Sequence, residues 1–417
     1  MEPFKTLGAD IESLWSAKNY NETHLPEISV DALKRADLPS KLTAWDVVEW
    51  AMSQSELPPQ RDLNASFGDP PITVYSGARF HIDVYFWFEG TTAIHQHGFC
   101  GAFQVLMGSS IHSWYDFQTH EVINTFCEIG EMGLKVCEIL EVGAIQPILA
   151  GRQYIHSLFH LEQPSATIVV RTDRSPLHLP QLSYHKPGLA IDPFFEQATV
   201  TKKLQAMSAL LRAKHRDADR MIASWIETSD LQTSFMILSQ VRAMLRSDQL
   251  GQMFNADAVG SRFGEMLEIV SRRYPSAAET LSYVFEHSDE LDYIVKRRSV
   301  VTEPEHRFFL ALLLNVDGRD RILSLITQRF AGVDPIEKIL DWTFDLAQTR
   351  IFGIDHSNAL GIADFGDPEM FALERLLKGK SDHEIKSECA ESNHEQPAAV
   401  SDAIKKLRHA IIFRPLL

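Results

Sequence analysis

The sequence predicts an α+β protein, in which a β-barrel or β-sandwich lies between a short N-terminal helical segment and a longer C-terminal helical domain. Short runs of aromatic and β-branched residues, broken by Gly or Pro, fill residues 69–190, and such runs are typical of barrels and sandwiches. On both sides of this region, apolar residues recur at helical spacing instead. Because no helix-length periodic segment separates the predicted strands, a fold of alternating strands and helices is disfavoured.

Residues 1–68 are predicted to form the N-terminal helical segment. Apolar residues follow helical spacing in residues 1–18 and again in residues 31–53. Pro58 and Pro59 then indicate a loop. We therefore expect two helices ahead of the barrel.

Residues 69–190 are predicted to form the barrel. Turn-forming residues recur between apolar runs at short, regular intervals, which favours strands over helices here. The predicted strands cover residues 72–75, 78–88, 101–107, 110–117, 133–140, 153–161 and 166–172.

Residues 191–417 are predicted to form an α-helical domain that covers the barrel, closes its pocket or forms a dimer. Apolar residues at i, i+3 and i+4 predict helices over 194–214, 217–227, 230–245, 259–274, 277–286, 304–314, 319–330, 335–349 and 401–413. The run Ser381-Asp-His-Glu384 is a capping-box pattern and indicates a further helix start. No clean internal repeat is present, which argues against a solenoid.

The composition narrows the classes of partner. The chain carries 40 Lys and Arg against 56 Asp and Glu, a net charge of −16, which argues against broad binding to nucleic acid or anionic membranes. Neither a membrane-length apolar run nor a secretory signal pattern is found, and the four cysteines form no C-x-x-C pair. We therefore expect a cytoplasmic protein with a small-molecule substrate, no nucleic acid or membrane partner, and a homodimer as an open alternative.

Two histidines separated by one residue carry the clearest chemical signal. His95 and His97 lie in the predicted β region, and residues two apart in a strand point to the same side. A third ligand is offered by His156, which follows a Pro- and Gly-containing turn and enters a later strand. Imidazole binds zinc, iron, copper and nickel. We expect a metal site at these histidines, with ordinary barrel-wall histidines as the alternative.

The first histidine segment resembles the first motif of the cupin superfamily, G-x5-H-x-H-x3,4-E-x6-G. Gly90 opens the match one residue closer than the motif, His95 and His97 occupy the ligand positions, and Gly108 closes it. Gly101 stands where the motif has its ligand glutamate. The resemblance therefore implies a metal site that lacks the usual carboxylate.

The second segment resembles the second cupin motif, G-x5-P-x-G-x2-H-x3-N. Gly143, Pro147, Gly151 and His156 follow in the motif's order, with two extra residues, and His160 stands at the position of the asparagine. Together the two matches imply a cupin barrel, that is, a double-stranded β-helix.

A three-histidine site is similar to the cysteine-dioxygenase-like branch of the cupins, which uses non-haem iron(II) and O2. The lead-in strand resembles that branch as well, because Trp87 comes shortly before a Glu-Gly pair and the two histidines. This resemblance covers about residues 75–172 and implies Fe(II) with O2 as cosubstrate; zinc, nickel and manganese stay open. The branch's upstream carboxylate-binding arginine and its Ser-x-His-x-Tyr run have no counterpart, and residues 167–171 stand in place of the latter.

The strand before the histidines has two different faces. Its even positions are all apolar and must be buried. Its odd positions are polar and aromatic, which suits the wall of a ligand pocket; the alternative is that they face solvent. The expected substrate-binding residues are Arg79, His81, Asp83, Tyr85 and Trp87.

Three further residues are expected to have catalytic roles. Tyr154 and His160 share a strand face with His156, and Arg171 is a candidate for binding a substrate carboxylate. The expected function is a non-haem iron(II) oxygenase that oxidises a small anionic or amino-acid-like substrate. The alternative is a non-catalytic, small-molecule-binding cupin coupled to a helical partner-interaction domain.

Overall fold

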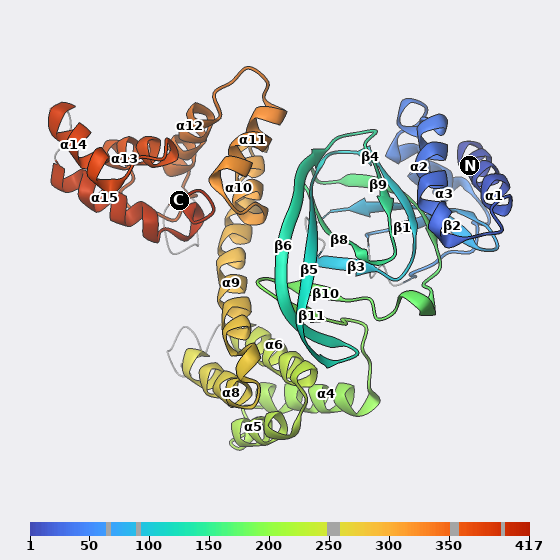
Figure 1. The fold of residues 1–417 in the computed structure, drawn as a ribbon, viewed down its shortest axis with the longest axis horizontal. Helices are drawn as coiled ribbons and strands as arrows, with labels where there is room; N and C mark the ends of the chain where they lie inside the picture. The colour runs from blue at the N-terminus through green and yellow to red at the C-terminus, as the bar shows by residue number, and fades with distance from the viewer. Residues whose placement is uncertain (64–67, 89–92, 248–258, 351–357, 393–396) are drawn as a thin grey trace.

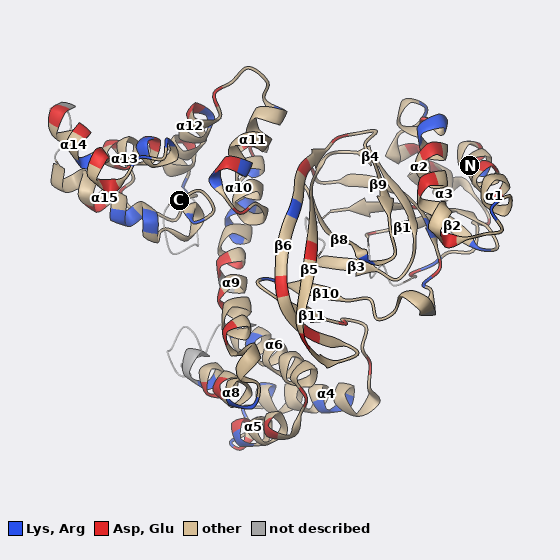
Figure 2. Cartoon of the chain, viewed as in Figure 1, with Lys and Arg blue, Asp and Glu red and all other residues tan. Residues whose placement is uncertain are grey.

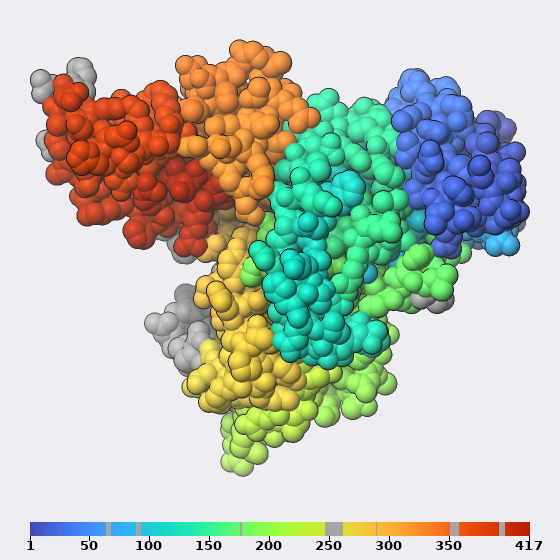
Figure 3. Space-filling view, in the orientation of Figure 1, coloured from blue at the N-terminus to red at the C-terminus, as the bar shows by residue number. Residues whose placement is uncertain are grey.

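The computed structural model describes residues 1–417 except 64–67, 89–92, 248–258, 351–357 and 393–396. A central β domain is flanked by the N-terminal helices on one side and by the C-terminal helices on the other (Figure 1). The space-filling view shows the β domain packed against both groups (Figure 3). The predicted α+β class is confirmed.

The N-terminal segment contains α1 (Glu2–Ser16), α2 (Leu25–Ala36) and α3 (Ala44–Ser53), with the short 3₁₀ helices η1 (Glu22–His24) and η2 (Leu38–Ser40). The single helix expected over residues 31–53 is therefore two helices. Asp37 ends α2 in the left-handed conformation, with φ 44° and ψ 53°, and Pro39 lies two residues further on. The chain restarts at Thr43, whose hydroxyl caps the backbone of Asp46 in a capping box.

Antiparallel strands form two sheets. The first sheet has the order β1-β2-β9-β4-β7, and the second closes on itself in the order β10-β11-β6-β5-β8-β3. The strands are β1 (Pro71–Ser76), β2 (Phe80–Trp87), β3 (Ile94–His97), β4 (Gly101–Met107), β5 (Ser110–Asn124), β6 (Cys127–Leu140), β7 (Ile145–Ile148), β8 (Gly151–His160), β9 (Ser165–Thr172), β10 (Ser183–His185) and β11 (Leu189–Ile191).

Strand β2 of the first sheet is buried on both faces. Its even residues, including Phe80, Ile82 and Phe86, share one core with Phe4 and Trp15 of the N-terminal helix α1. Its odd residues face the second sheet, where Tyr85 joins a cluster with residues of both sheets. The apolar face is thus buried by helices, and from His81 to Trp87 the polar and aromatic face points into the barrel rather than to solvent.

The space between the sheets is filled by aromatic and aliphatic side chains. Tyr85 and Phe103 of the first sheet meet Tyr154 and Leu158 of the second. The opposite faces of the second sheet's strands form another cluster, in which Tyr115, Ile155 and Tyr184 take part. One face of the second sheet therefore points toward the first sheet, and its other face points away from it. Each of the two cavities described below lies on one of these faces.

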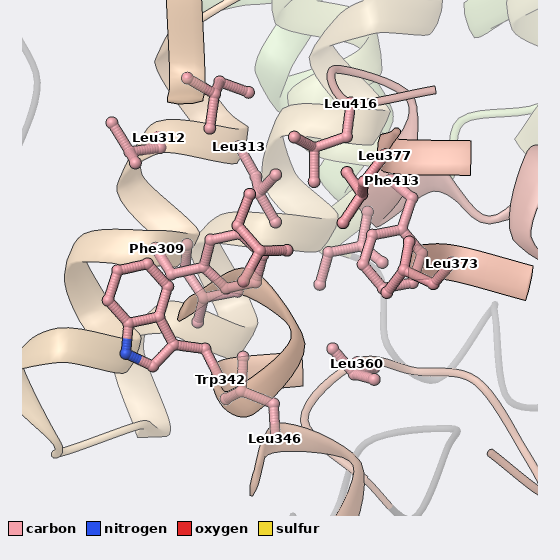
Figure 4. Close-up of a cluster of buried hydrophobic side chains, with 14 of the residues drawn as sticks. Phe309, Leu312, Leu313, Trp342, Leu346, Leu360, Leu373, Leu377, Phe413 and Leu416 are labelled. Atoms are coloured by element: carbon pink, nitrogen blue, oxygen red, sulfur yellow. The ribbon is translucent and has the colours of Figure 1, made fainter. Parts of the chain in front are cut away.

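The C-terminal part is helical and packs in two groups. One core joins α4 to α9 with Ile129 and Leu189 of the barrel, and the other joins α9 to α15 with Ile111 and Phe159. Figure 4 shows part of the second core, where Phe309 and Trp342 pack together. The helices are α4 (Ala198–Arg212), α5 (Ala218–Thr228), α6 (Leu231–Ser247), α8 (Val259–Arg273), α9 (Pro275–Val300), α10 (Pro304–Asn315), α11 (Arg319–Arg329), α12 (Pro335–Gln348), α13 (Asp367–Leu377), α14 (Asp382–Ser392) and α15 (Pro397–His409); the 3₁₀ helices η3 (Pro176–His178) and η4 (Ile411–Phe413) complete the elements.

Charged residues are distributed unevenly over these parts. Figure 2 shows Lys, Arg, Asp and Glu gathered mainly on the helices, whereas most of the barrel ribbon is uncharged. Within the described residues, no helix has the length and apolar character that a membrane span requires.

Candidate metal centre

The three histidines predicted as ligands come together between the sheets. His95 of β3 lies directly opposite His156 of β8 in the antiparallel register, and His97 follows on the same face of β3 after a bulge. One side-chain nitrogen of each residue lies within 4.8 Å of the other two, and all three side chains are buried. The H-x-H alternation and the β3–β8 pairing together produce this group.

The ring contacts show how tightly the group is packed. The Nε2 atoms of His97 and His156 are 2.8 Å apart, and the ring centroids of His95 and His97 are 4.6 Å apart. Nδ1 of His95 lies 2.7 Å from the carbonyl oxygen of Ala93. A donated hydrogen bond there fixes the proton on Nδ1 and leaves the Nε2 lone pair available.

Burial keeps these imidazoles neutral. It lowers the pKa of His95, and it lowers the pKa of His97 and of His156 well below the ordinary histidine value, helped by repulsion from the neighbouring imidazoles. Neutral imidazole is the form that binds metal ions. The group is therefore in the correct protonation state near neutral pH.

The residues present fit a bound cation. Two facing Nε2 atoms at 2.8 Å have overlapping lone pairs unless a proton or a cation lies between them. The Nδ1 atoms of His97 and His156 are buried and have no hydrogen-bond partner among the described residues, so each ring can hold its proton there and direct Nε2 to the group's centre. Three neutral nitrogen donors suit iron, zinc, copper or nickel.

The absence of a fourth carboxylate ligand has a steric cause. A Cβ atom at Gly101 would lie 1.9 Å from the carbonyl oxygen of Val170, on the adjacent strand β9. No side chain fits there without a backbone shift, so the usual cupin glutamate cannot stand at this position. Gly90, which opens the first motif, lies outside the described residues.

A small cavity of about 40 Å³ adjoins the three histidines. Phe99, Phe103, Ile148, Leu158 and Val169 make its wall largely apolar, and Tyr85, Trp87, Thr167 and Arg171 contribute the other lining groups. Two of the residues expected on the pocket wall, Tyr85 and Trp87, are therefore there. A volume of this size holds little more than one water-sized group, since a water occupies about 30 Å³ in the liquid. A larger ligand requires a wall side chain to move.

Arg171 is the cationic side chain among the described residues that line this cavity. Its guanidinium carbon lies 3.4 Å from the ring centroid of Phe99, and that ring is 4.5 Å from the ring of His97. Its Nε donates to the carbonyl oxygen of Thr172 at 3.3 Å. A planar guanidinium placed here can bind a carboxylate beside the histidine group.

A buried hydrogen-bond network lies behind Tyr85. The Tyr85 hydroxyl donates to Asp83 at 3.0 Å, and the hydroxyl of Thr73 donates to the same carboxylate at 2.7 Å. His81 Nε2 is 3.2 Å from Asp83. Burial by itself would raise the pKa of Asp83, but His81, Thr73 and Arg171 together hold it below its ordinary value. His81 and Asp83 thus support the cavity wall and do not line it.

Tyr154 belongs to a second network, which the sequence did not reveal as a unit. Its ring is 4.3 Å from the ring of His156, and its hydroxyl lies 3.0 Å from Nε2 of His112. Nδ1 of His112 lies 3.0 Å from Glu138, which also accepts from Gln146 at 3.1 Å. The sequence does predict strands that contain His112 and Glu138. It does not predict how those strands pair, and only the pairing places the two residues opposite each other.

Arg79 and His160 are placed differently from expectation. The exposed Arg79 lies outside β2 with its guanidinium 4.5 Å from the Tyr20 ring centroid, so it does not face the cavity. His160 stacks on Trp87 at 4.6 Å, and its Nδ1 meets the hydroxyls of Ser110 and Ser165. Burial lowers the pKa of His160 to about 3. His160 is outside the ligand group and packs behind Trp87, which lines the cavity.

No family model matches the sequence, and no curated protein is significantly similar to it. Solved structures do show similarity. One is a cupin-2 domain protein from Shewanella frigidimarina (10% identity, 32% of this chain and 96% of that chain, TM-score 0.18). Another is a double-stranded β-helix protein from Klebsiella pneumoniae (13%, 36% and 96%, 0.19). A third is a recombinant oxalate oxidase in complex with glycolate (14%, 33% and 64%, 0.18).

At these identities and TM-scores the matches carry no argument about activity, and they do not single out the cysteine-dioxygenase-like branch. The fold itself is decided by the strands. Two antiparallel sheets enclose a buried group of three histidines, which come from paired strands. The β domain therefore has the cupin fold that the two histidine motifs predict.

Proposed function

We propose that this protein is a non-haem iron(II)-dependent cupin oxygenase that oxidises a small carboxylate substrate with O2. The observation that carries the proposal is a buried group of three neutral imidazoles beside an apolar cavity with Arg171 in its wall. Neutral ligands leave the charge of a bound cation uncompensated, which favours an anionic substrate.

The chain's own residues would bind and orient the reactants. His95, His97 and His156 would hold iron(II), which supplies open coordination positions and one-electron chemistry with O2 when bound. Arg171 would bind the substrate carboxylate, and the wall of Phe99, Phe103 and Leu158 would exclude water.

Two networks would keep the site rigid. Asp83 holds the hydroxyl of Tyr85 on one side of the cavity, and the contact from Tyr154 to His112 fixes the ring that packs on His156. Neither network needs to exchange protons for this role, because the contacts alone define the orientation of the rings.

Metal content tests the ligand assignment. Full-length protein purified without oxygen and reconstituted with iron(II) is expected to bind about one iron per chain by elemental mass spectrometry. His95→Ala, His97→Ala and His156→Ala should each lose most of it, because two remaining imidazoles bind weakly. His160→Ala is the matched control, since this buried histidine lies outside the group, and it should keep its iron. Wild-type protein without iron would overturn the proposal.

Oxygen consumption tests the activity. The iron-loaded protein should consume O2 with one or more members of a panel of small carboxylates and amino acids, and Arg171→Leu should lose that activity while it keeps its iron. Binding of a carboxylate without O2 consumption would instead support a second candidate, a ligand-binding cupin coupled to the helical domain. The observation that favours this candidate is that barrel residues Ile111 and Phe159 share one core with α10 and α12.

A further inference from the structure

A second cavity lies between the β domain and the helices, on the faces of β3 and β8 that point away from the histidine group. Its volume is about 560 Å³, within the range of small-molecule sites. Strands β3, β5, β8 and β10 form one wall, and helices α6 and α9 contribute most of the other. Figure 1 shows α6 and α9 beside this end of the barrel.

The charged groups of this cavity are mostly cationic. Lys186, Arg242 and Arg246 line it, against one lining carboxylate, Asp292, among the described residues. Three cations and one carboxylate thus stand on the described part of the cavity wall, whereas carboxylates outnumber cations in the chain as a whole, which has a net charge of −16. Lys186 also pairs with Asp317 and Arg246 with Asp292, which holds these cations in place at the wall. The charge pattern favours an anionic ligand.

Aromatic rings alternate with these cations. Phe235 stacks on Phe285 at 5.6 Å, and the ring of His185 lies 5.1 Å from Phe235. Nζ of Lys186 lies 5.8 Å from the ring centroid of Tyr115. Burial lowers the pKa of His185 to about 4, so the imidazole is neutral near pH 7. Aromatic side chains that line a cavity favour an aromatic ligand, through edge-to-face or offset ring contacts.

The cavity adjoins the strands that position the histidine group. Ile94 lines it and precedes His95, and Ser157 lines it and follows His156. Tyr184 of β10 pairs with Ile94 across the sheet. A molecule in this cavity therefore contacts the same two strands as the histidine group, but from their opposite faces.

We propose that this interdomain cavity is a second binding site, which takes a planar aromatic anion with its acidic group at Lys186 and its ring against Phe235 and His185. Three observations agree on this class of ligand: the volume, the excess of cations over carboxylates, and the alternation of rings and cations along the wall. The site does not depend on the proposed oxygenase activity, because none of its lining residues lines the histidine cavity.

Anilinonaphthalene sulfonate, an aromatic anion with a planar naphthalene ring whose fluorescence rises on binding, tests the site on the full-length protein. Wild type should bind it at one saturable site. Lys186→Gln should weaken binding about tenfold, since a charged contact is lost. Ser239→Trp, which places a large side chain on the cavity wall, should abolish binding at that site. The matched control is Lys203→Gln, because the exposed Lys203 also lies near an aromatic ring, Trp225, at 5.4 Å but outside the cavity.

Uncharged N-phenylnaphthylamine separates the contribution of the anion from that of the ring. It should bind much more weakly than the sulfonate and should respond little to Lys186→Gln. Circular dichroism and melting temperature establish that each variant is folded. Unchanged affinity in folded Lys186→Gln, equal affinity for the uncharged dye, or undisturbed binding in folded Ser239→Trp would each overturn the proposal. If Lys186→Gln fails to fold, Ser239→Trp and the uncharged dye still decide the outcome.

Discussion

At position 101 the structure explains why this site has three ligands rather than four. The backbone of Val170 approaches Gly101 so closely that any Cβ collides with its carbonyl oxygen. The close pairing of β4 with β9 at this position thus excludes a fourth ligand from residue 101.

Gly101→Ala should accordingly destabilise the protein by about 1–3 kcal/mol, the usual cost of overpacking. Gly264→Ala is the matched control: Gly264 lies in α8 with nothing within 4 Å of the added Cβ. That change should stabilise the protein by about 0.5–1 kcal/mol, because glycine is entropically unfavourable in a helix. Urea unfolding measures both. A Gly101→Ala protein as stable as wild type would contradict the steric explanation.

The Asp83 carboxylate contributes to the stability of the folded protein in a way that depends on pH. Its pKa is lowered in the folded state by His81, Thr73 and Arg171, in spite of burial. A lowered carboxyl pKa contributes stability above the unfolded value of about 3.9, and this contribution is lost as the pH falls through the folded value.

Below about pH 4 the loss of this contribution should add to the decline in the free energy of unfolding that the buried neutral histidines cause below about pH 6.5. Asp83→Asn should be less stable at pH 6 and should lack the added decline below pH 4. Urea unfolding at several pH values between pH 6 and pH 3 measures this. Asp320→Asn is the control, because this side chain is 84% exposed. Parallel pH profiles for wild type and Asp83→Asn would show that ionised Asp83 does not stabilise the folded state.

At the scale of an element, β2 shows how one strand serves two environments. Its even residues bind the N-terminal helices to the barrel, and its odd residues from His81 to Trp87 build the cavity wall and its support. The helices α1 to α3 therefore contribute to the site indirectly, because they hold the strand on which Tyr85 and Trp87 stand.

Phe86→Ala should cost about 3–5 kcal/mol, as is usual for a fully buried phenylalanine. The ring is 1% exposed and lies 6.1 Å from Trp45 of α3. Phe88→Ala, two residues further along, is the control. Phe88 is 47% exposed, so its removal should change the stability by less than about 0.5 kcal/mol. Equal costs for the two variants would mean that the helices do not stabilise this strand.

At the scale of the whole molecule, the barrel and the helical domain share their cores. Barrel residues take part in both helical clusters, and the buried Arg298 connects the two parts. Arg298 of α9 donates to the carbonyl oxygen of Leu161 in the barrel at 3.0 Å and lies 4.6 Å from the ring of Phe159. The helical domain is therefore packed onto the barrel rather than tethered to it.

Arg298→Ala should destabilise the protein by about 1–3 kcal/mol, because it leaves a buried carbonyl group without its donor. The control, Arg272→Ala, removes a side chain that is 66% exposed and pairs with Glu268; it should change the stability by less than about 0.5 kcal/mol. Thermal unfolding compares them. The same melting temperature in both variants would show that Arg298 does not stabilise the interface.

Some helices were not predicted because buried charge hides their pattern. The sequence predicted a helix over 277–286, whereas α9 continues to Val300. Its second half includes Arg297 and Arg298, whose side chains are only 2% and 6% exposed. Prediction from periodicity assigns arginine to the solvent-facing side of a helix, so the buried side of this half was not recognised. Helix α13 was missed as well, and there Glu369 is buried in the first turn. Strands β10 and β11 have three residues each, too few for an alternation signal.

The sequence by itself determined which major segments are helical and which are β-structure, and which three histidines form the buried group. Both depend on local periodicity and on the two-residue alternation within a strand, which short stretches of chain encode. Only the tertiary structure decided which face of β2 points inward, because both faces are buried and neither is a solvent face. It also decided that His112 and Glu138 meet behind Tyr154, and that a cationic cavity lies behind the histidine strands. Those arrangements depend on register and on contacts between distant segments, for which no local pattern exists.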